Sequence, residues 1–223
     1  TPSPSIPAAT LLPLSSPATL EEPTAPEPAS TAAPERQSAW WETAVFYEIF
    51  VRSFYDSDGD GIGDFNGVTA RLDYLNDGDP NTSSDLGVTA LWLMPVFPSP
   101  SYHGYDVTDY YTVNPPYGTL DDFKRLLREA KKRGIRVVID LVLNHTSSLH
   151  PWFVQADADP QSPYRDWYLW SDQDPGADMP GWRPGQTGYY YAYFDPGMPD
   201  LNYNNPAVTE EITRIVTFWL KEV

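Results

Sequence analysis

Three short apolar runs alternate along the chain with segments in which apolar residues recur every three or four positions. The runs lie near residues 44–54, 88–95 and 136–145 and are rich in aromatic or β-branched residues. Such runs are typical of β-strands, and the periodic segments between them are typical of amphipathic helices. Short links from helix to strand predict right-handed crossovers and a parallel sheet. The pattern therefore predicts an α/β fold made of strand–helix units.

Capping signals mark where the expected helices begin. Asn66 is expected to cap the first helix. Thr119, with Asp122 three residues later, resembles a capping box. Asn205 is expected to cap the last helix.

The third run, from Arg136 to His145, carries the first hint of chemistry. We expect it to be a strand buried on both faces, as in a parallel sheet. Asp140 places a charge inside the run, which is costly unless the charge is paired. Asn144 and His145 lie where the run ends. In α/β barrels the functional side chains lie at this end of the strands.

The chain is expected to divide into four parts. Residues 1–38 hold nine of the 24 prolines and one basic residue, so they are expected to form an extended leader or linker. Residues 39–145 would be the first part of a barrel. Residues 146–203 are too long for a structureless loop and would form an inserted subdomain. Residues 204–223 would form the helix after it.

The charge balance narrows the classes of partner. The net charge is −17, with 31 acidic and 14 basic residues. This argues against nucleic acid and anionic membranes, which require basic patches, and favours metal cations or a neutral substrate. The chain has no cysteine, and no apolar run approaches the ~20 residues of a membrane span.

The stretch between residues 56 and 64 is the strongest local motif. Carboxylates at alternate positions converge when a loop winds tightly, and the glycines between them permit that winding. Oxygen ligands of this kind suit Ca²⁺, although the stretch lacks the final glutamate of an EF-hand loop. The alternative is a solvated acidic turn. The predicted ligands are Asp56, Asp58, Asp60, the Ile62 carbonyl and Asp64.

The stretch Tyr102–Asp106 follows the second run and would lie at the same sheet edge as His145. The ring of Tyr105 can stack on a sugar, and His103 can hydrogen-bond hydroxyl groups. The alternative for Tyr105 is a packed aromatic residue. The histidine spacing shows no zinc motif.

Four stretches, in this order, resemble motifs of the α-amylase family of glycoside hydrolases, glycoside hydrolase family 13. Residues 56–64 resemble the calcium loop of many members, and residues 91–95 resemble the second barrel strand. Residues 140–145 resemble the end of the third strand, and residues 198–202 resemble a motif near the end of the domain inserted after it. The resemblance covers about residues 40–223.

This resemblance implies a (β/α)₈ TIM barrel, of which the chain holds three strand–helix units and the inserted domain B. It implies retaining hydrolysis of α-glucosidic bonds by two carboxyl groups. By similarity, Tyr105 stacks on a sugar ring while His103 and His145 hydrogen-bond its hydroxyls. Asn144 resembles a residue that ligates calcium in many α-amylases, and Asp140 would orient the site.

The family's nucleophile, acid/base and third carboxylate lie on later strands, and their motifs do not occur here. No catalytic residue is therefore expected in this stretch. The nucleophile and the acid/base are expected beyond Val223. We expect the stretch to be an inactive N-terminal portion of a longer enzyme.

The leading hypothesis is a secreted or cell-surface hydrolase of starch-like α-glucans or malto-oligosaccharides, of the α-amylase type. An α-glucosidase or transglycosylase of the same family is the first alternative. The second is a non-enzymatic, calcium-bound carbohydrate-binding surface protein. The proline-rich leader would serve as the tether of an exported domain; the alternative is an inert leader.

Overall fold

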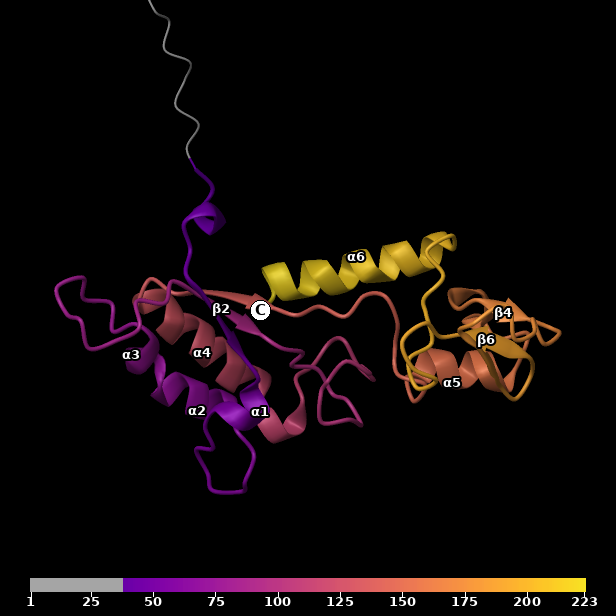
Figure 1. Cartoon of the computed structure of the whole chain (residues 1–223), viewed down its shortest axis with the longest axis horizontal. Helices are drawn as coiled ribbons and strands as arrows, with labels where there is room; N and C mark the ends of the chain where they lie inside the picture. Colours follow the sequence, from indigo (N-terminus) through magenta and orange to yellow (C-terminus); the bar gives the residue numbers. More distant parts are fainter. Residues whose placement is uncertain (1–37) are drawn as a thin grey trace, which may run out of the picture. The chain divides into compact units, whose positions relative to one another are not determined.

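The structure is a computed structural model that describes residues 38–223, so the expected leader over residues 1–37 lies outside the described residues. Two sheets and several helices form the described part (Figure 1). The strands are β1 (Phe46–Ile49), β2 (Ala90–Leu93), β3 (Arg136–Ile139), β4 (Trp170–Ser171), β5 (Trp182–Pro184) and β6 (Tyr189–Tyr191). The α-helices are α1 (Val51–Phe54), α2 (Phe65–Ala70), α3 (Leu72–Leu75), α4 (Leu120–Lys132), α5 (Pro151–Ala158) and α6 (Pro206–Lys221). Short 3₁₀ turns are η1 (Trp40–Glu42), η2 (Pro115–Tyr117) and η3 (Arg165–Trp167).

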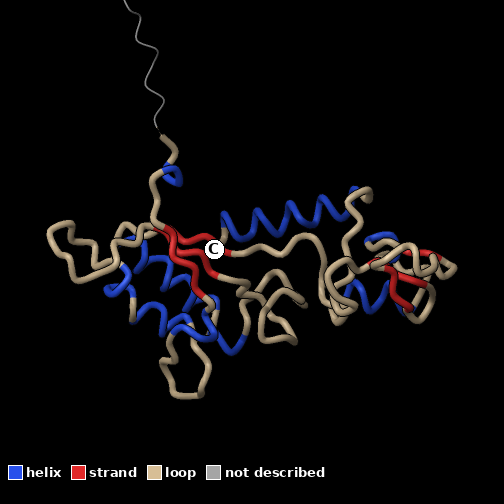
Figure 2. The backbone as a smooth tube through the Cα atoms, in the orientation of Figure 1, coloured by secondary structure: helices blue, strands red, loops and turns tan. Residues whose placement is uncertain are grey.

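The first sheet has the predicted parallel arrangement, with the order β1-β2-β3 (Figure 2). Ile49, Leu93 and Ile139 lie in register across it. Helices separate the three strands along the chain, which confirms the predicted α/β alternation. Residues 38–223 do not close this sheet into a barrel.

Helices α2 and α4 pack against each other through the rings of Phe65 and Phe123, whose centroids are 5.1 Å apart. The predicted capping box of α4 is present. Thr119 Oγ1 accepts from the Asp122 backbone N–H at 3.2 Å, and the Thr119 N–H donates to Asp122 Oδ2 at 2.9 Å. The sequence prediction for the start of this helix is confirmed.

Helix α6 also begins where its capping signal predicted. Asn205 Oδ1 accepts from the Ala207 backbone N–H at 3.0 Å. At the other end of the helix, Trp219 is buried and its Nε1 donates to the Tyr110 carbonyl at 2.7 Å. The Trp219 ring lies 5.2 Å from that of Phe97. These contacts attach α6 to the loop that follows β2.

The first run and the first helix differ from the prediction. The strand expected over residues 44–54 ends at Ile49, and the chain then forms the short helix α1. Helix α1 is joined to the acidic loop after it by the Gly63 N–H, which donates to the Arg52 carbonyl at 2.7 Å. The cap of α2 is Asp64, not Asn66, because the Asp64 carboxylate accepts from the Gly67 N–H at 2.7 Å.

The expectation that the third run is buried on both faces is wrong within residues 38–223. Leu91 and Leu93 of β2 are fully buried, whereas Trp92 and its in-register neighbour Val138 of β3 are 41% and 39% exposed. The physical reason is that side chains alternate between the two faces of a strand and only one face is covered by helices among the described residues.

Between His145 and α6 the chain forms a second, antiparallel sheet with the order β4-β6-β5. The Arg165 guanidinium lies 3.5 Å from the ring centroid of Trp170, and Phe153 of α5 packs on the same ring at 5.7 Å. Phe153 and Trp170 therefore belong to the core of this segment. The boundaries of the inserted domain, 146–203, remain a prediction.

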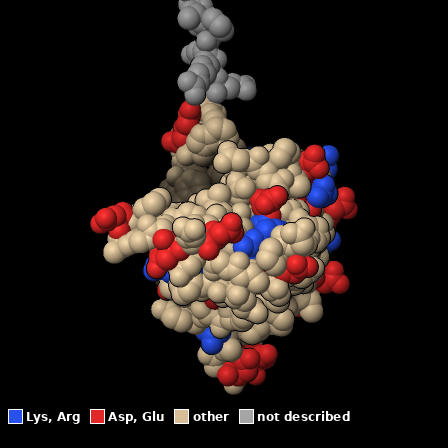
Figure 3. Space-filling model, turned by 90° about the vertical axis from the view of Figure 1, so that its right-hand side faces the viewer, with Lys and Arg blue, Asp and Glu red and all other residues tan. Residues whose placement is uncertain are grey.

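Acidic side chains are spread over the face shown in Figure 3, with fewer basic ones between them. None of the helices within residues 38–223 combines the length and the apolar character that crossing a membrane requires.

His150 is buried and caps α5, because its Nδ1 accepts from the Trp152 N–H at 3.2 Å. Burial lowers the pKa of His150 to about 4, from 6.5. The unfolded chain therefore binds the proton more tightly. The stabilisation from neutral His150 is complete above pH 6.5 and is lost as the pH falls towards 4, by about 3 kcal/mol at most.

We expect His150→Asn, which can still cap the helix, to weaken the pH dependence of the unfolding free energy between pH 7 and pH 4. Denaturant unfolding at several pH values measures this. Parallel curves for wild type and His150→Asn would contradict the assignment.

Candidate functional site

A pocket of about 460 Å³ lies beyond the carboxyl ends of β2 and β3. Its walls come from the loop after β2, from the end of the third apolar run and from the loop between β6 and α6. The lining residues are His103, Tyr105, His145, Phe194, Asp195 and Met198. The three predicted sugar-binding residues therefore line one pocket.

Tyr105 is held in place by its hydroxyl, which donates to Asp140 Oδ2 at 2.9 Å. Partial burial and this hydrogen bond raise the pKa of Tyr105 to about 12, so the phenol stays protonated and neutral. The bond gives the Asp140 charge a partner near the sheet, which answers why a carboxylate is tolerated in an apolar run. It also leaves the Tyr105 ring fixed against the pocket.

Gly104 allows the two residues beside it to face the pocket. Its φ is +85°, and a Cβ atom there would lie 3.0 Å from the Pro95 carbonyl oxygen, so only glycine fits without strain. His103 Nδ1 accepts from the Tyr105 N–H at 3.1 Å. Since Nδ1 acts as an acceptor, the donor nitrogen of the ring is Nε2, which has no hydrogen-bond partner among residues 38–223 and is available to a ligand.

His145 is buried, and burial lowers its pKa below the usual value, so its ring is neutral near pH 7. Its Nε2 lies 3.1 Å from the Tyr105 carbonyl oxygen, to which it donates. The Asn144 amide nitrogen lies 3.4 Å from His145 Nδ1. Both ring nitrogens thus have protein neighbours, and the predicted bond from His145 to a sugar hydroxyl stays a prediction.

The sequence prediction missed Phe194, Asp195 and Met198. The Phe194 ring lies 5.3 Å from that of His145 and is 62% exposed. These residues follow the aromatic run Tyr189–Tyr193 and precede or open the motif at residues 198–202, so their position beside a motif was the available signal.

Backbone hydrogen bonds bring this loop to the end of the third run. The Leu201 N–H donates to the Asn144 carbonyl at 2.9 Å, and the Thr146 N–H donates to the Pro199 carbonyl at 3.2 Å. Two motifs that lie more than 50 residues apart in the sequence therefore form one wall of the pocket.

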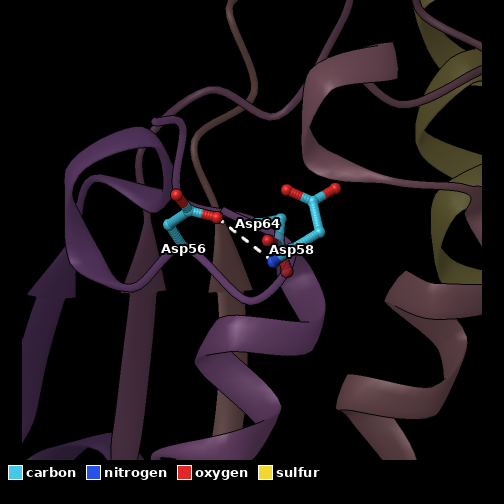
Figure 4. A group of neighbouring side chains, drawn as sticks. All are labelled: Asp56, Asp58 and Asp64. Atoms are coloured by element: carbon cyan, nitrogen blue, oxygen red, sulfur yellow. Dashed lines mark hydrogen bonds between the residues drawn. The ribbon is translucent and has the colours of Figure 1, made fainter. Parts of the chain in front are cut away.

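The acidic loop forms a second group of functional candidates. Asp56, Asp58 and Asp64 each offer a carboxylate oxygen, and these oxygens lie within 4.8 Å of one another. Figure 4 shows the three side chains on the loop, with the hydrogen bond from the Asp58 N–H to Asp56 dashed. Three converging carboxylates suit a hard cation such as Ca²⁺.

The other two predicted ligands of this loop are Asp60 and the Ile62 carbonyl. Asp60 is exposed and lies outside this group of three; its carboxylate accepts from the Ile62 N–H at 2.7 Å. The N–H groups of Gly61 and Gly59 donate to Asp56 and lower its pKa. Asp56 is therefore ionised at neutral pH and ready to bind a cation. Asn144 is exposed and is not part of this acidic group.

Comparisons with known proteins show which family the chain resembles. The family profile described as "Alpha amylase, catalytic domain" matches residues 48–223. Alpha-amylase 3 of Dictyoglomus thermophilum is 53% identical over 183 residues, which are 82% of this chain and 35% of that protein. An oligo-1,6-glucosidase of Parageobacillus thermoglucosidasius is 43% identical over 196 residues, 82% of this chain and 34% of that protein.

A crystal structure of the alpha-amylase from H. orenii matches with a TM-score of 0.77 and 59% identity, over 80% of this chain and 38% of that chain. The chain thus spans about a third of the length of these relatives. The family match extends over most of the chain, and the residues that line the pocket lie within it. The chain therefore belongs to the alpha-amylase family of glycoside hydrolases, as its motifs predicted.

Proposed function

We propose that this chain forms the N-terminal part of the catalytic domain of an α-amylase-type enzyme that hydrolyses α-glucosidic bonds of starch-like glucans with retention of configuration. The observation that carries the proposal is the pocket in which Tyr105, fixed by Asp140, lies with His103 and His145. A flat ring beside neutral hydrogen-bonding groups suits an uncharged sugar, which has apolar C–H faces and polar edges.

In this proposal the described residues bind and orient a glucose unit. Tyr105 supplies the stacking surface, and His103 donates from Nε2 to a sugar hydroxyl. Neutral His145 keeps the loop of Tyr105 in position through its bond to the Tyr105 carbonyl. The two carboxyl groups that break the bond are proposed to lie outside residues 38–223, on strands that complete a (β/α)₈ barrel.

We also propose a structural Ca²⁺ on the acidic loop, with Asp56, Asp58 and Asp64 as the central ligands and Asp60 and the Ile62 carbonyl completing the set. The convergence of three carboxylate oxygens within 4.8 Å supports this. Without a cation the three like charges repel one another. Asn144, which is exposed, remains our candidate ligand for a calcium between the barrel and domain B. The ion on the acidic loop would offset part of the loop's negative charge and supply no chemistry to the reaction.

The proposed location is extracellular or cell-surface, with residues 1–38 as a linker and residues 146–203 as domain B. The proline-rich leader supports export, and the absence of cysteine is compatible with it. The net charge of −17 suits an uncharged substrate better than a polyanion.

One relative that is 43% identical is named an oligo-1,6-glucosidase, so an exo-acting glucosidase is the second candidate. Product analysis with the full-length protein, meaning the polypeptide encoded by its complete coding sequence, separates the two. We expect a mixture of malto-oligosaccharides from soluble starch. Glucose released mainly from short oligosaccharides, with starch left intact, would favour the glucosidase.

A further inference from the structure

Tyr110 is a buried tyrosine that lies outside the pocket but bonds to a residue of its wall. Its side chain is only 1% exposed. Its hydroxyl donates to the backbone carbonyl of His145 at 2.8 Å, although the two residues lie 35 positions apart in the sequence. Tyr110 does not line the pocket, and the sugar binding described above gives it no role.

The His145 carbonyl depends on this hydroxyl for its hydrogen bond. His145 lies opposite Asp200 in an isolated antiparallel bridge. The backbone bonds of the bridge use the carbonyl of Asn144 and the N–H of Thr146, so His145 belongs to a pair that exchanges no hydrogen bonds of its own. Among residues 38–223, Tyr110 is the only residue that donates to the His145 carbonyl.

Three hydrogen bonds connect Tyr110 to the ring that faces the pocket. The first is the bond from the Tyr110 hydroxyl to the His145 carbonyl. The second runs from His145 Nε2 to the Tyr105 carbonyl at 3.1 Å, and the third from the Tyr105 hydroxyl to Asp140 at 2.9 Å. Because each bond fixes the residue that makes the next one, the position of the Tyr105 ring depends on a hydroxyl in the core.

Tyr110 is itself fixed by residues from three segments. Trp219 of α6 donates from Nε1 to the Tyr110 carbonyl at 2.7 Å. The Tyr110 ring lies 6.1 Å from the stacked ring of Trp152 in α5, and 5.7 Å from the ring of Phe97 in the loop after β2. Burial raises the pKa of Tyr110 well above its usual value, so the hydroxyl stays protonated and remains a donor at neutral pH. A rigid donor therefore faces the His145 carbonyl.

We propose that Tyr110 is a positioning residue, whose buried hydroxyl fixes His145 and through His145 places the Tyr105 ring for sugar binding. The inference rests on the proposed function, because it takes the pocket to be a sugar site. Without the hydroxyl the His145 carbonyl would be buried without a donor, and such a group is costly unless the backbone moves to find another partner. A movement of this kind would displace the ring that the sugar contacts, and small displacements of a binding group weaken its contacts.

The test is titration calorimetry of the full-length protein with a thio-linked maltotetraose, in which sulfur replaces the glycosidic oxygens so that the ligand resists hydrolysis. Tyr110→Phe keeps the packed ring and removes only the hydroxyl. We expect its Kd to rise about tenfold while the binding stoichiometry stays unchanged. A merely structural role would instead reduce the stoichiometry, through loss of folded protein, and leave the Kd at the wild-type value. Tyr117→Phe, the same change at a buried tyrosine that packs on Phe65 outside the pocket, is the matched control and should change neither quantity.

A double-mutant cycle with Tyr105→Ala tests whether Tyr110 acts through Tyr105. In the Tyr105→Ala background, Tyr110→Phe should change the Kd by less than about twofold, because the ring that it positions is gone. If Tyr110→Phe does not fold, Trp219→Phe is measured by the same two criteria. It removes the bond to the Tyr110 carbonyl, and its Kd should rise about threefold.

A wild-type Kd in the single variant, or losses that multiply in the double variant, would overturn the inference while leaving the proposed function standing. A wild-type protein that does not bind the thio-linked sugar would overturn both. If the wild type binds it and the variants show the expected pattern, but starch is not hydrolysed, the inference holds and the proposed hydrolysis fails.

Discussion

Removing divalent cations with EDTA is expected to lower the Tm of the full-length protein by about 5 °C or more, and added Ca²⁺ is expected to restore it. The physical reason is that Asp56, Asp58 and Asp64 converge on one point of the loop. A cation that binds only this folded arrangement stabilises it. Thermal unfolding followed by circular dichroism, together with metal analysis of the purified protein, measures the effect.

Asp64 connects the cation loop to α2. Its carboxylate accepts from the Gly67 N–H, the Ser57 N–H at 2.8 Å and the Ser57 hydroxyl at 2.8 Å. We therefore expect Asp64→Ala to lower the unfolding free energy by about 3 kcal/mol even with EDTA present, through the lost helix cap and its charged hydrogen bonds.

The same variant should also lose most of the Tm response to Ca²⁺. Asp178→Ala, at an exposed position outside the acidic group, is the control and should respond as wild type does. If EDTA leaves the Tm unchanged and the purified protein contains no calcium, the acidic loop is a solvated turn.

Replacing Tyr105 with alanine is expected to lower kcat/KM on starch about a hundredfold. Losing the buried and stacked part of an aromatic ring removes about 3 kcal/mol of binding, and about 1.4 kcal/mol corresponds to a factor of ten. The loss should be large because Tyr105 lines the pocket and is fixed by Asp140.

Tyr105→Phe separates the ring from the hydroxyl. It keeps the stacking surface but leaves Asp140 Oδ2 without the hydroxyl that donates to it, so we expect a loss of roughly tenfold. A Tyr105→Phe variant as impaired as Tyr105→Ala would mean that the hydrogen bond, and not the stacking surface, is what the site requires. Steady-state kinetics of both variants decide between these roles.

Local signals predicted the parts of the fold that depend on local contacts. The Thr119–Asp122 capping box and the Asn205 cap were found where the sequence placed them, because each uses side chains within three residues of the helix start. The first cap was wrong because two candidates, Asp64 and Asn66, lie two residues apart. The conformation of the acidic loop makes Asp64 the N-cap of α2, and sequence spacing alone could not distinguish it from Asn66.

Only part of the candidate site could be predicted from the sequence. Tyr105, His103 and His145 could be found because they sit in motifs at the ends of apolar runs. Phe194 belongs to a loop that reaches the pocket through hydrogen bonds between distant backbone groups, such as Leu201 to Asn144. Such non-local pairing leaves no periodic trace in the sequence.

The anomeric form of the first products tests the central claim most directly. Proton NMR of starch incubated with the full-length protein should show new reducing ends that appear first as the α-anomer and then equilibrate, as retaining cleavage of an α-glucosidic bond requires. Products that appear first as the β-anomer would contradict retention. A folded, calcium-loaded protein that neither cleaves nor binds any α-glucan would contradict the proposed function as a whole.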